Sequence, residues 1–175
     1  MQLEEMQLAD VKKLSPKVFF DDRGFFYESF KEPLLKEKGL QSSFVQDNHS
    51  YSKKGVLRGM HFQKGQAKLV NVISGVIFDV FVDIRKESPT FGEWGGIVLD
   101  SSKRELLLIP DGFAHGFYVM SDDAHVLYKV SEVYDLAAEK SFRFDDPTVA
   151  IDWPEGAKIV SKRDQSAPYF TEVFV

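Results

Sequence analysis

Short apolar strands, each ended by a turn, recur along most of this chain, and this pattern limits what the chain can fold into. In residues 76–84, VIFDVFVDI, the alternation leaves one wholly apolar face and one mixed face. Residues 68–73 and the Ser74-Gly75 turn come just before and predict a hairpin over 68–84. Further strands are predicted at 97–100, 105–110, 114–120 and 125–130. Strands at intervals of about 8 to 12 residues, with only short helices, predict an all-β sandwich or barrel.

The parts of the chain before and after these strands also have patterns that predict local structure. Residues 18–30, VFFDDRGFFYESF, predict a strand, a tight turn and a second strand. Residues 31–39 predict a short helix with Pro33 in its first turn and Gly39 at its end. The turn-rich residues 145–156 are expected to lie across the barrel.

Composition narrows the class of protein. A length of 175 residues without repeats or linkers predicts one domain over residues 1–175. The absence of cysteine excludes disulfides and thiolate metal sites, so chemistry must come from other side chains. A net charge of -5 gives no global basic field, so nucleic acid is not an expected partner. The acidic N-terminus and the lack of a long apolar run predict a soluble, cytoplasmic protein without a membrane partner.

Two of the four histidines stand in strand-like contexts beside glycine and aromatic residues: His61 in GMHF and His115 in FAHGF. His49 and His125 are expected in a loop and a turn at the surface. The spacing around His61 and His115 resembles the two-part signature of the cupin barrel. Metal cupins place a second histidine two residues after the first, where this chain has Gln63, and no carboxylate follows at the expected spacing.

Without a bound metal, His61 is free to act as a general base near neutral pH. Arg58 and Lys68 are close to it in sequence, and Tyr128 lies on a later strand. Such a set suits cofactor-free proton abstraction next to a carbonyl: the histidine takes the proton, a cation stabilises the enolate, and the tyrosine returns a proton.

Several long segments carry a family resemblance. They are DDRGFFYESF, QDNHSYSKKGVLRGMHFQ, QAKLVNVISGVIFDVFVDIRKESPTFGEW, IPDGFAHGF, LYK, DDPTVAIDWP and SKRD. In this order, over roughly residues 16 to 168, they resemble the dTDP-4-dehydrorhamnose 3,5-epimerase family. The resemblance implies a jelly-roll cupin homodimer that epimerises C3 and C5 of dTDP-4-keto-6-deoxyglucose with no metal and no coenzyme.

The resemblance also implies roles for single residues. His61 matches the base, Asp164 in SKRD the carboxylate of its dyad, Tyr128 in LYK the proton donor, and Lys68 the cation near the C4 oxygen. A carboxylate on one ring nitrogen fixes the tautomer of the imidazole and raises the basicity of the other nitrogen.

Further matched positions bind the ligand. Arg23 and Glu28 match positions that the family supplies from the partner subunit, so the N-terminal strand region is expected to contact that subunit. The remaining matched positions are Gln46, Asn48, Arg58, His115, Tyr134, Glu139 and Arg163. Among these, Arg58 suits the diphosphate and Tyr134 suits stacking on the thymine ring. The sequence departs from the family at Asn71, Asp145 and Arg163, where arginine, asparagine and lysine are common.

Three other functions stay open at this point. An enzyme that inverts only C3 has nearly the same site residues. A metal-dependent cupin would use His61, Gln63 and His115. A non-catalytic module would bind the sugar nucleotide without exchanging its protons.

Overall fold

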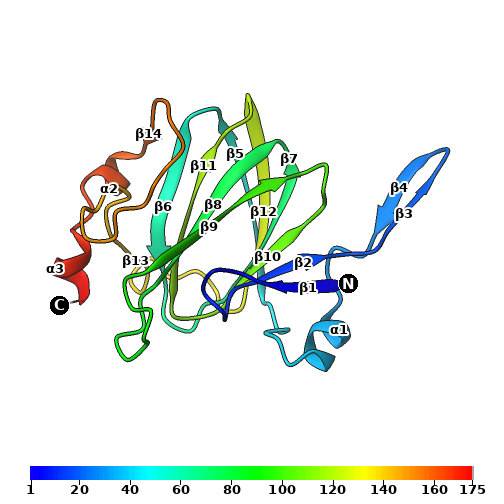
Figure 1. The fold of residues 1–175 in the computed structure, drawn as a ribbon, viewed down its shortest axis with the longest axis horizontal. Coiled ribbons are helices and arrows are strands. Elements are labelled where there is room, and N and C mark those ends of the chain that lie inside the picture. The colour runs from blue at the N-terminus through cyan, green and yellow to red at the C-terminus, as the bar shows by residue number, and fades with distance from the viewer. Residues whose placement is uncertain (175) are drawn as a thin grey trace.

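The computed structural model describes residues 1–174, which form two facing β-sheets with a few short helices (Figure 1). The strands of the first sheet are β1 (Gln2–Glu5), β2 (Lys12–Ser15), β5 (Gln46–Lys53), β7 (Lys68–Ser74), β10 (Leu106–Ile109) and β12 (Asp123–Val130). Those of the second sheet are β6 (Val56–Phe62), β8 (Val76–Asp83), β9 (Trp94–Asp100), β11 (Phe113–Val119), β13 (Lys140–Ser141) and β14 (Ile159–Val160).

The topology is that of a jelly roll. The first sheet has the order β1-β2-β10-β7-β12-β5, and the second has the order β13-β6-β11-β8-β9 with β14 beside β6. From β9 to β12 the chain changes sheet at every connection, and all strand pairs except β14 with β6 are antiparallel. This arrangement confirms the predicted all-β cupin fold.

The predicted hairpin over residues 68–84 is wrong. Strand β7 pairs with β10 and β12 in the first sheet, and β8 pairs with β11 and β9 in the second. Only Gly75 separates them, at a φ of +88°, and a Cβ there would lie 2.2 Å from the Asp123 carbonyl oxygen. The chain therefore turns sharply at Gly75 and crosses between the sheets. The predicted strands themselves are present, but their pairing differs.

The main core fills the space between the two sheets. Its buried side chains come from both sheets, including Val70, Ile77, Leu107, Phe117 and Val126. Strand β8 directs its mixed face into the barrel, whereas its wholly apolar face packs outward against the C-terminal part of the chain. The inward face therefore brings a carboxylate, that of Asp79, into the barrel interior.

The segment after β12 covers the outer face of the second sheet, as residues 145–156 were expected to do (Figure 1). Phe142 and Phe170 pack there against Met60, Val80 and Val82. This segment carries β13, β14, α2 (Lys162–Gln165) and α3 (Phe170–Phe174).

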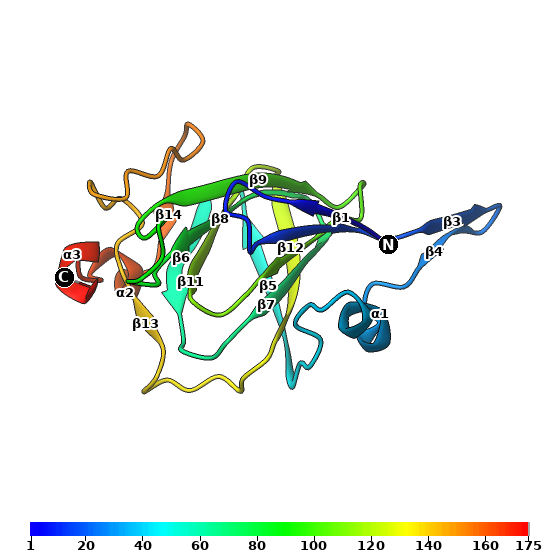
Figure 2. The same cartoon turned by 60° about the horizontal axis from the view of Figure 1, so that its bottom comes forward.

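The N-terminal hairpin forms a small sheet separate from the two sheets of the barrel. Strands β3 (Val18–Asp21) and β4 (Gly24–Tyr27) pair only with each other and project from the body (Figure 2). The predicted strand, turn and strand are confirmed. Helix α1 (Glu32–Glu37) follows, with Pro33 in its first turn as predicted. Among the described residues, no helix has the length and apolar character needed to cross a bilayer.

Candidate active site

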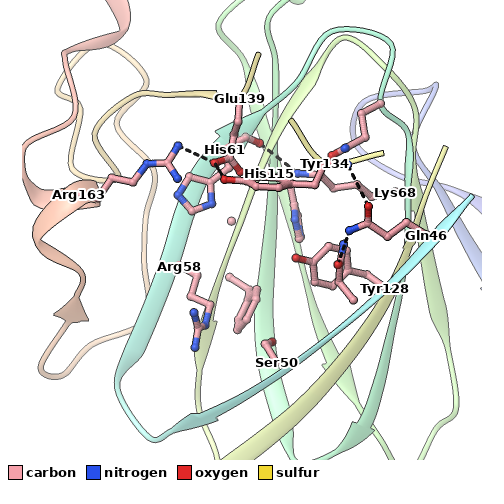
Figure 3. A pocket seen from close by; sticks show the side chains of 14 residues that line it. Gln46, Ser50, Arg58, His61, Lys68, His115, Tyr128, Tyr134, Glu139 and Arg163 are labelled. Carbon is pink, nitrogen blue, oxygen red and sulfur yellow. Dashed lines mark hydrogen bonds and ion pairs between the residues drawn. The ribbon is translucent and has the colours of Figure 1, made fainter. Parts of the chain in front are cut away.

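A cavity of about 370 Å³ opens between the two sheets and collects most of the predicted site residues (Figure 3). The first sheet contributes side chains from β5, β7 and β12, and the second contributes side chains from β6 and β11. The predicted residues that line it are Gln46, Asn48, Arg58, His61, Lys68, His115, Tyr128, Tyr134, Glu139 and Arg163. Ser50, Gln66, Gly116 and Phe117 line it as well and were not singled out from the sequence.

His61 and Asp164 form a dyad at the wall of this cavity. The Nε2 atom of His61 lies 2.6 Å from Oδ1 of Asp164. Because an ionised carboxylate only accepts hydrogen bonds, Nε2 carries the proton and Nδ1 keeps a free lone pair. Burial works to raise the pKa of the Asp164 carboxyl, but its hydrogen bond and charge interaction with His61 hold that pKa below its usual range. The dyad therefore holds an ionised carboxylate against the imidazole.

Two features of the C-terminal segment place Asp164. Ser161 caps α2 and accepts a hydrogen bond from the Asp164 backbone N–H at 3.1 Å. Asp146 is buried and accepts hydrogen bonds from the backbone N–H groups of Thr148 at 2.8 Å and Phe170 at 2.6 Å. The hydrogen bond between Asp146 and Phe170 ties together the two ends of the segment that contains α2. The segment therefore holds Asp164 beside strand β6.

Close contact of β6 with β11 places the two strand histidines opposite each other. The register pairs His115 with His61 and then shifts before Phe117. A Cβ on Gly59 would lie 2.6 Å from the Cα of Gly116, so both positions require glycine. This explains why GVLRGMHFQ carries a glycine two residues before its histidine.

Tyr128 comes from β12, in the sheet opposite His61, and faces the same cavity (Figure 3). Burial raises the pKa of its phenol, and the negative charge of Glu139 raises it further. The tyrosine therefore stays protonated at neutral pH and can donate a proton.

Lys68 is the buried cation of the cavity. Burial lowers the pKa of its ammonium to about 8, while the carboxylates of Glu139 and Asp79 oppose this decrease. Its Nζ donates a hydrogen bond of 3.3 Å to the backbone carbonyl of His61. The ammonium is thus desolvated but still charged at neutral pH, which strengthens its effect on nearby negative charge.

The rim of the cavity is a network of polar side chains. Glu139 accepts a hydrogen bond from the Tyr134 hydroxyl at 3.2 Å and pairs with Arg163 at 2.5 Å. Gln46 accepts a hydrogen bond from the Tyr134 backbone N–H and donates to Asn48 at 2.7 Å. Elsewhere on the wall, Arg58 donates to the Ser52 hydroxyl at 3.0 Å.

Arg23 and Glu28 do not reach this cavity within the chain. Arg23 lies at the exposed tip of the β3-β4 hairpin and pairs with Asp21 at 2.6 Å, and Glu28 pairs with Lys31 at 2.9 Å. Of the three departures from the family, only Arg163 lines the cavity. Asn71 lies on the outer side of β7, and Asp145 pairs with Arg143 at 2.7 Å.

Gln63 lies outside the cavity and has a structural role. Its side-chain amide donates to the Val133 carbonyl at 2.9 Å and accepts from the Asp135 backbone N–H at 3.0 Å. Both polar atoms are thus used to hold the segment that carries Tyr134. Within residues 1–174, no three histidine, aspartate or glutamate side chains group as ligands for a metal ion.

Asp79 is the residue that the sequence argument missed. Its carboxylate is fully buried and lies 2.9 Å and 3.0 Å from Nε2 of His115. The signal was present, because Asp79 is one of two aspartates on the mixed face of VIFDVFVDI, a strand that is otherwise apolar.

The jelly-roll barrel and its cavity define a class: a cupin-type isomerase whose site is equipped for proton transfer. The comparisons with known proteins give the family. The family model described as dTDP-4-dehydrorhamnose 3,5-epimerase matches residues 5–172, and the chain belongs to this family.

Three similar proteins illustrate the relationship. The dTDP-4-dehydrorhamnose 3,5-epimerase of Salmonella typhimurium is 47% identical over 173 residues, covering 96% of this chain and 94% of that protein. The solved dTDP-6-deoxy-D-glucose-3,5-epimerase of Legionella pneumophila, in complex with dTDP-4-keto-L-rhamnose, has a TM-score of 0.94 and 45% identity, covering 97% of this chain and 93% of that one. The 3'-monoepimerase ChmJ of Streptomyces bikiniensis, in complex with dTDP-quinovose, has a TM-score of 0.89 and 31% identity, covering 95% of this chain and 87% of that one.

Proposed function

We propose that this enzyme converts dTDP-4-dehydro-6-deoxy-D-glucose into dTDP-4-dehydro-L-rhamnose by inverting C3 and C5. The observation that carries the proposal is the His61–Asp164 dyad on one wall of a cavity whose opposite wall presents Tyr128. A base and an acid on opposite faces of a sugar ring are what inversion at carbon requires. The Legionella relative, which binds the dTDP-4-keto-L-rhamnose product, supports this substrate class.

The reaction takes place next to the C4 ketone, which makes the protons on C3 and C5 acidic. The free Nδ1 of His61 removes one proton, and the electron pair moves into an enolate at the C4 oxygen. Lys68 stabilises that negative charge in the desolvated cavity. Tyr128 then delivers a proton to the same carbon from the opposite face, and both side chains return to their starting states by exchange with water.

The nucleotide part of the substrate suits the rim. Arg58 and Arg163 offer guanidinium groups for the diphosphate. Tyr134 is 44% exposed at the cavity edge, which suits stacking of its ring on thymine. The other proposed contacts come from Gln46, Asn48, His115 and Glu139.

The test is to incubate dTDP-4-keto-6-deoxyglucose with the enzyme in D2O and to follow C3-H and C5-H by NMR. We expect deuterium at both carbons, formation of the inverted product, and no change when EDTA is added. Exchange at C3 alone would identify the C3-only epimerase, a reaction of the kind named for the similar ChmJ monoepimerase. Loss of activity in EDTA would favour a metal cupin. Tight binding with no exchange at all would leave a binding module.

We further propose that the enzyme works as a homodimer whose sites are shared. The β3-β4 hairpin exposes four phenylalanines, Phe19, Phe20, Phe25 and Phe26, each more than half accessible to solvent in the single chain. Such a projecting apolar ribbon suits burial against a second copy of the chain. Docked there, it would bring Arg23 and Glu28 to the partner's cavity. We place the reaction in the cytoplasm, because a nucleotide sugar is a charged molecule that does not cross a bilayer freely.

An Arg23→Ala variant is expected to raise KM roughly tenfold with little change in kcat, because a charged hydrogen-bond donor to the ligand is lost. Lys36→Ala, on the exposed side of α1, serves as the surface control and should behave as wild type.

Mixing the two variant proteins tests whether each active site uses residues of both subunits or of one chain alone. When Arg23→Ala and His61→Ala chains exchange subunits, about half of the dimers are hybrids with one intact site. At substrate concentrations well below KM, where Arg23→Ala dimers keep roughly a tenth of the wild-type rate, the mixture should therefore rise to about a quarter of the wild-type activity. No restoration after demonstrated subunit exchange, or a fully active monomer, would refute the shared site.

A further inference from the structure

A second histidine–aspartate pair faces the cavity, and its carboxylate is Asp79. The side chain of Asp79 is 0% exposed, and both of its oxygens lie within 3.0 Å of Nε2 of His115. His115 comes from β11 and stands directly opposite His61 on β6. The two imidazoles therefore line one cavity, and each is held from behind by its own buried carboxylate.

The geometry fixes which nitrogen of His115 is available to a ligand. An ionised carboxylate accepts hydrogen bonds only, so Nε2 of His115 carries a proton directed at Asp79. Nδ1 is then the ring nitrogen that remains for the substrate. Burying a carboxylate is costly unless it is well paired, and a hydrophobic pair in its place would stabilise the barrel as well or better. The pair therefore calls for an explanation other than stability.

Asp79 also acts on Lys68. Its negative charge raises the pKa of the Lys68 ammonium, which burial has lowered to about 8. The other titratable or charged groups around this cavity are Arg58 and His61 from β6, His115 from β11, Tyr128 from β12, Tyr134 and Glu139 from the segment after β12, and Arg163 from α2. Among the carboxylates of residues 1–174, those of Glu139 and Asp79 raise the pKa of Lys68, and Glu139 is already paired with Arg163.

We infer that Asp79 is a positioning residue of this enzyme: it fixes the ring orientation and tautomer of His115, and it adds a second negative charge, besides that of Glu139, to the surroundings of Lys68. This inference rests on the proposed function, since it assigns a role within the same proton-transfer site. One buried carboxylate thereby orients the imidazole of His115 and interacts with Lys68, the cation proposed to stabilise the enolate.

The inference has a pH signature. Lys68 is charged below its pKa of about 8 and neutral above it, so kcat/KM falls as the pH rises through that value. Without the charge of Asp79, the pKa of Lys68 falls further, and the same decline begins at lower pH. We call this decline the basic limb of the pH profile. A variant that only destabilised the barrel would lower activity at every pH and leave the basic limb at the same pH.

The experiment compares Asp79→Asn with Asp83→Asn in the D2O exchange assay. Asp83 is a matched control, because it is also fully buried, on the same face of β8, but bonds to Arg85, Ser88 and Thr90 away from the cavity. We expect Asp79→Asn to lower kcat about 10- to 100-fold, with a smaller change in KM, and to move the basic limb to lower pH. Asp83→Asn is expected to lower the melting temperature and leave the limb where it is.

Two further measurements keep the inference open to refutation. In a His115→Gln background, Asp79→Asn should have a smaller effect on kcat but should still move the basic limb, since Lys68 is intact. NMR of the ring nitrogens in the wild-type enzyme should find His115 with its proton on Nε2, whether or not the variant folds.

The inference fails if the ring proton lies on Nδ1, or if Asp79→Asn leaves the limb unmoved in an active enzyme. It also fails if Asp83→Asn gives the same shift. Absence of exchange in the wild-type enzyme would refute the proposed function instead, so the two failures can be told apart.

Discussion

A His61→Ala variant is expected to lose deuterium exchange at both C3 and C5 by about 10²- to 10⁴-fold, the usual contribution of a general base. Both carbons should be affected together, because His61 is the imidazole paired with the Asp164 carboxylate in the cavity. The measurement is the NMR exchange assay at saturating substrate, with binding checked separately by calorimetry.

Two companion variants test the assignment of the base. His61→Asn keeps a hydrogen-bond donor for Asp164, so its fold should be retained while exchange stays as low as in the alanine variant. His49→Ala is the matched control, since His49 lies on β5 outside the cavity and its Nε2 is 3.0 Å from Nδ1 of His125. Near-normal exchange in a folded His61→Asn protein would remove His61 from the role of base.

Tyr128→Phe is expected to separate exchange from inversion. The ring still fills its place on β12, but the opposite face of the sugar has lost its proton donor. We expect the inverted product to form at least about 100-fold more slowly. His61 can still remove a proton and return a deuteron to the same face, so exchange with retention should fall much less.

The matched control for this variant is Tyr118→Phe. Tyr118 is buried on the outer side of β11, where its hydroxyl donates to the Ala157 carbonyl at 3.3 Å, away from the cavity. It should keep normal ratios of exchange to inversion. Equal losses of exchange and inversion in Tyr128→Phe would argue that another group delivers the proton.

Local patterns in the sequence predicted the strands well but not their partners. Alternation at 76–84 predicts a strand, and β8 is there, yet the adjacent β7 belongs to the other sheet. Pairing depends on which strands compete for each edge, and that competition involves residues far apart in the chain. His49 shows a similar limit: its polar surroundings predict a loop, whereas it lies on an edge strand, where alternate side chains face water.

The site residues that belong to recognisable sequence motifs were predicted from the sequence. Composition and spacing pointed to His61, and the family resemblance supplied Asp164, which lies 103 residues away and would otherwise pass for part of the tail. Ten matched residues do line one cavity, while Arg23 and Glu28 stay outside it in the single chain. Asp79 was missed because its role depends on a cross-strand neighbour, His115, and not on any spacing along the chain.

The tie between Asp146 and the C-terminal segment bears on how the dyad is assembled. His61 comes from a barrel strand, whereas its carboxylate partner comes from the segment that Asp146 holds at Phe170. The ribosome makes His61 103 residues before Asp164, so the imidazole is synthesised well before the carboxylate that pairs with it. A complete dyad therefore requires docking of the C-terminal segment as well as pairing of the barrel strands.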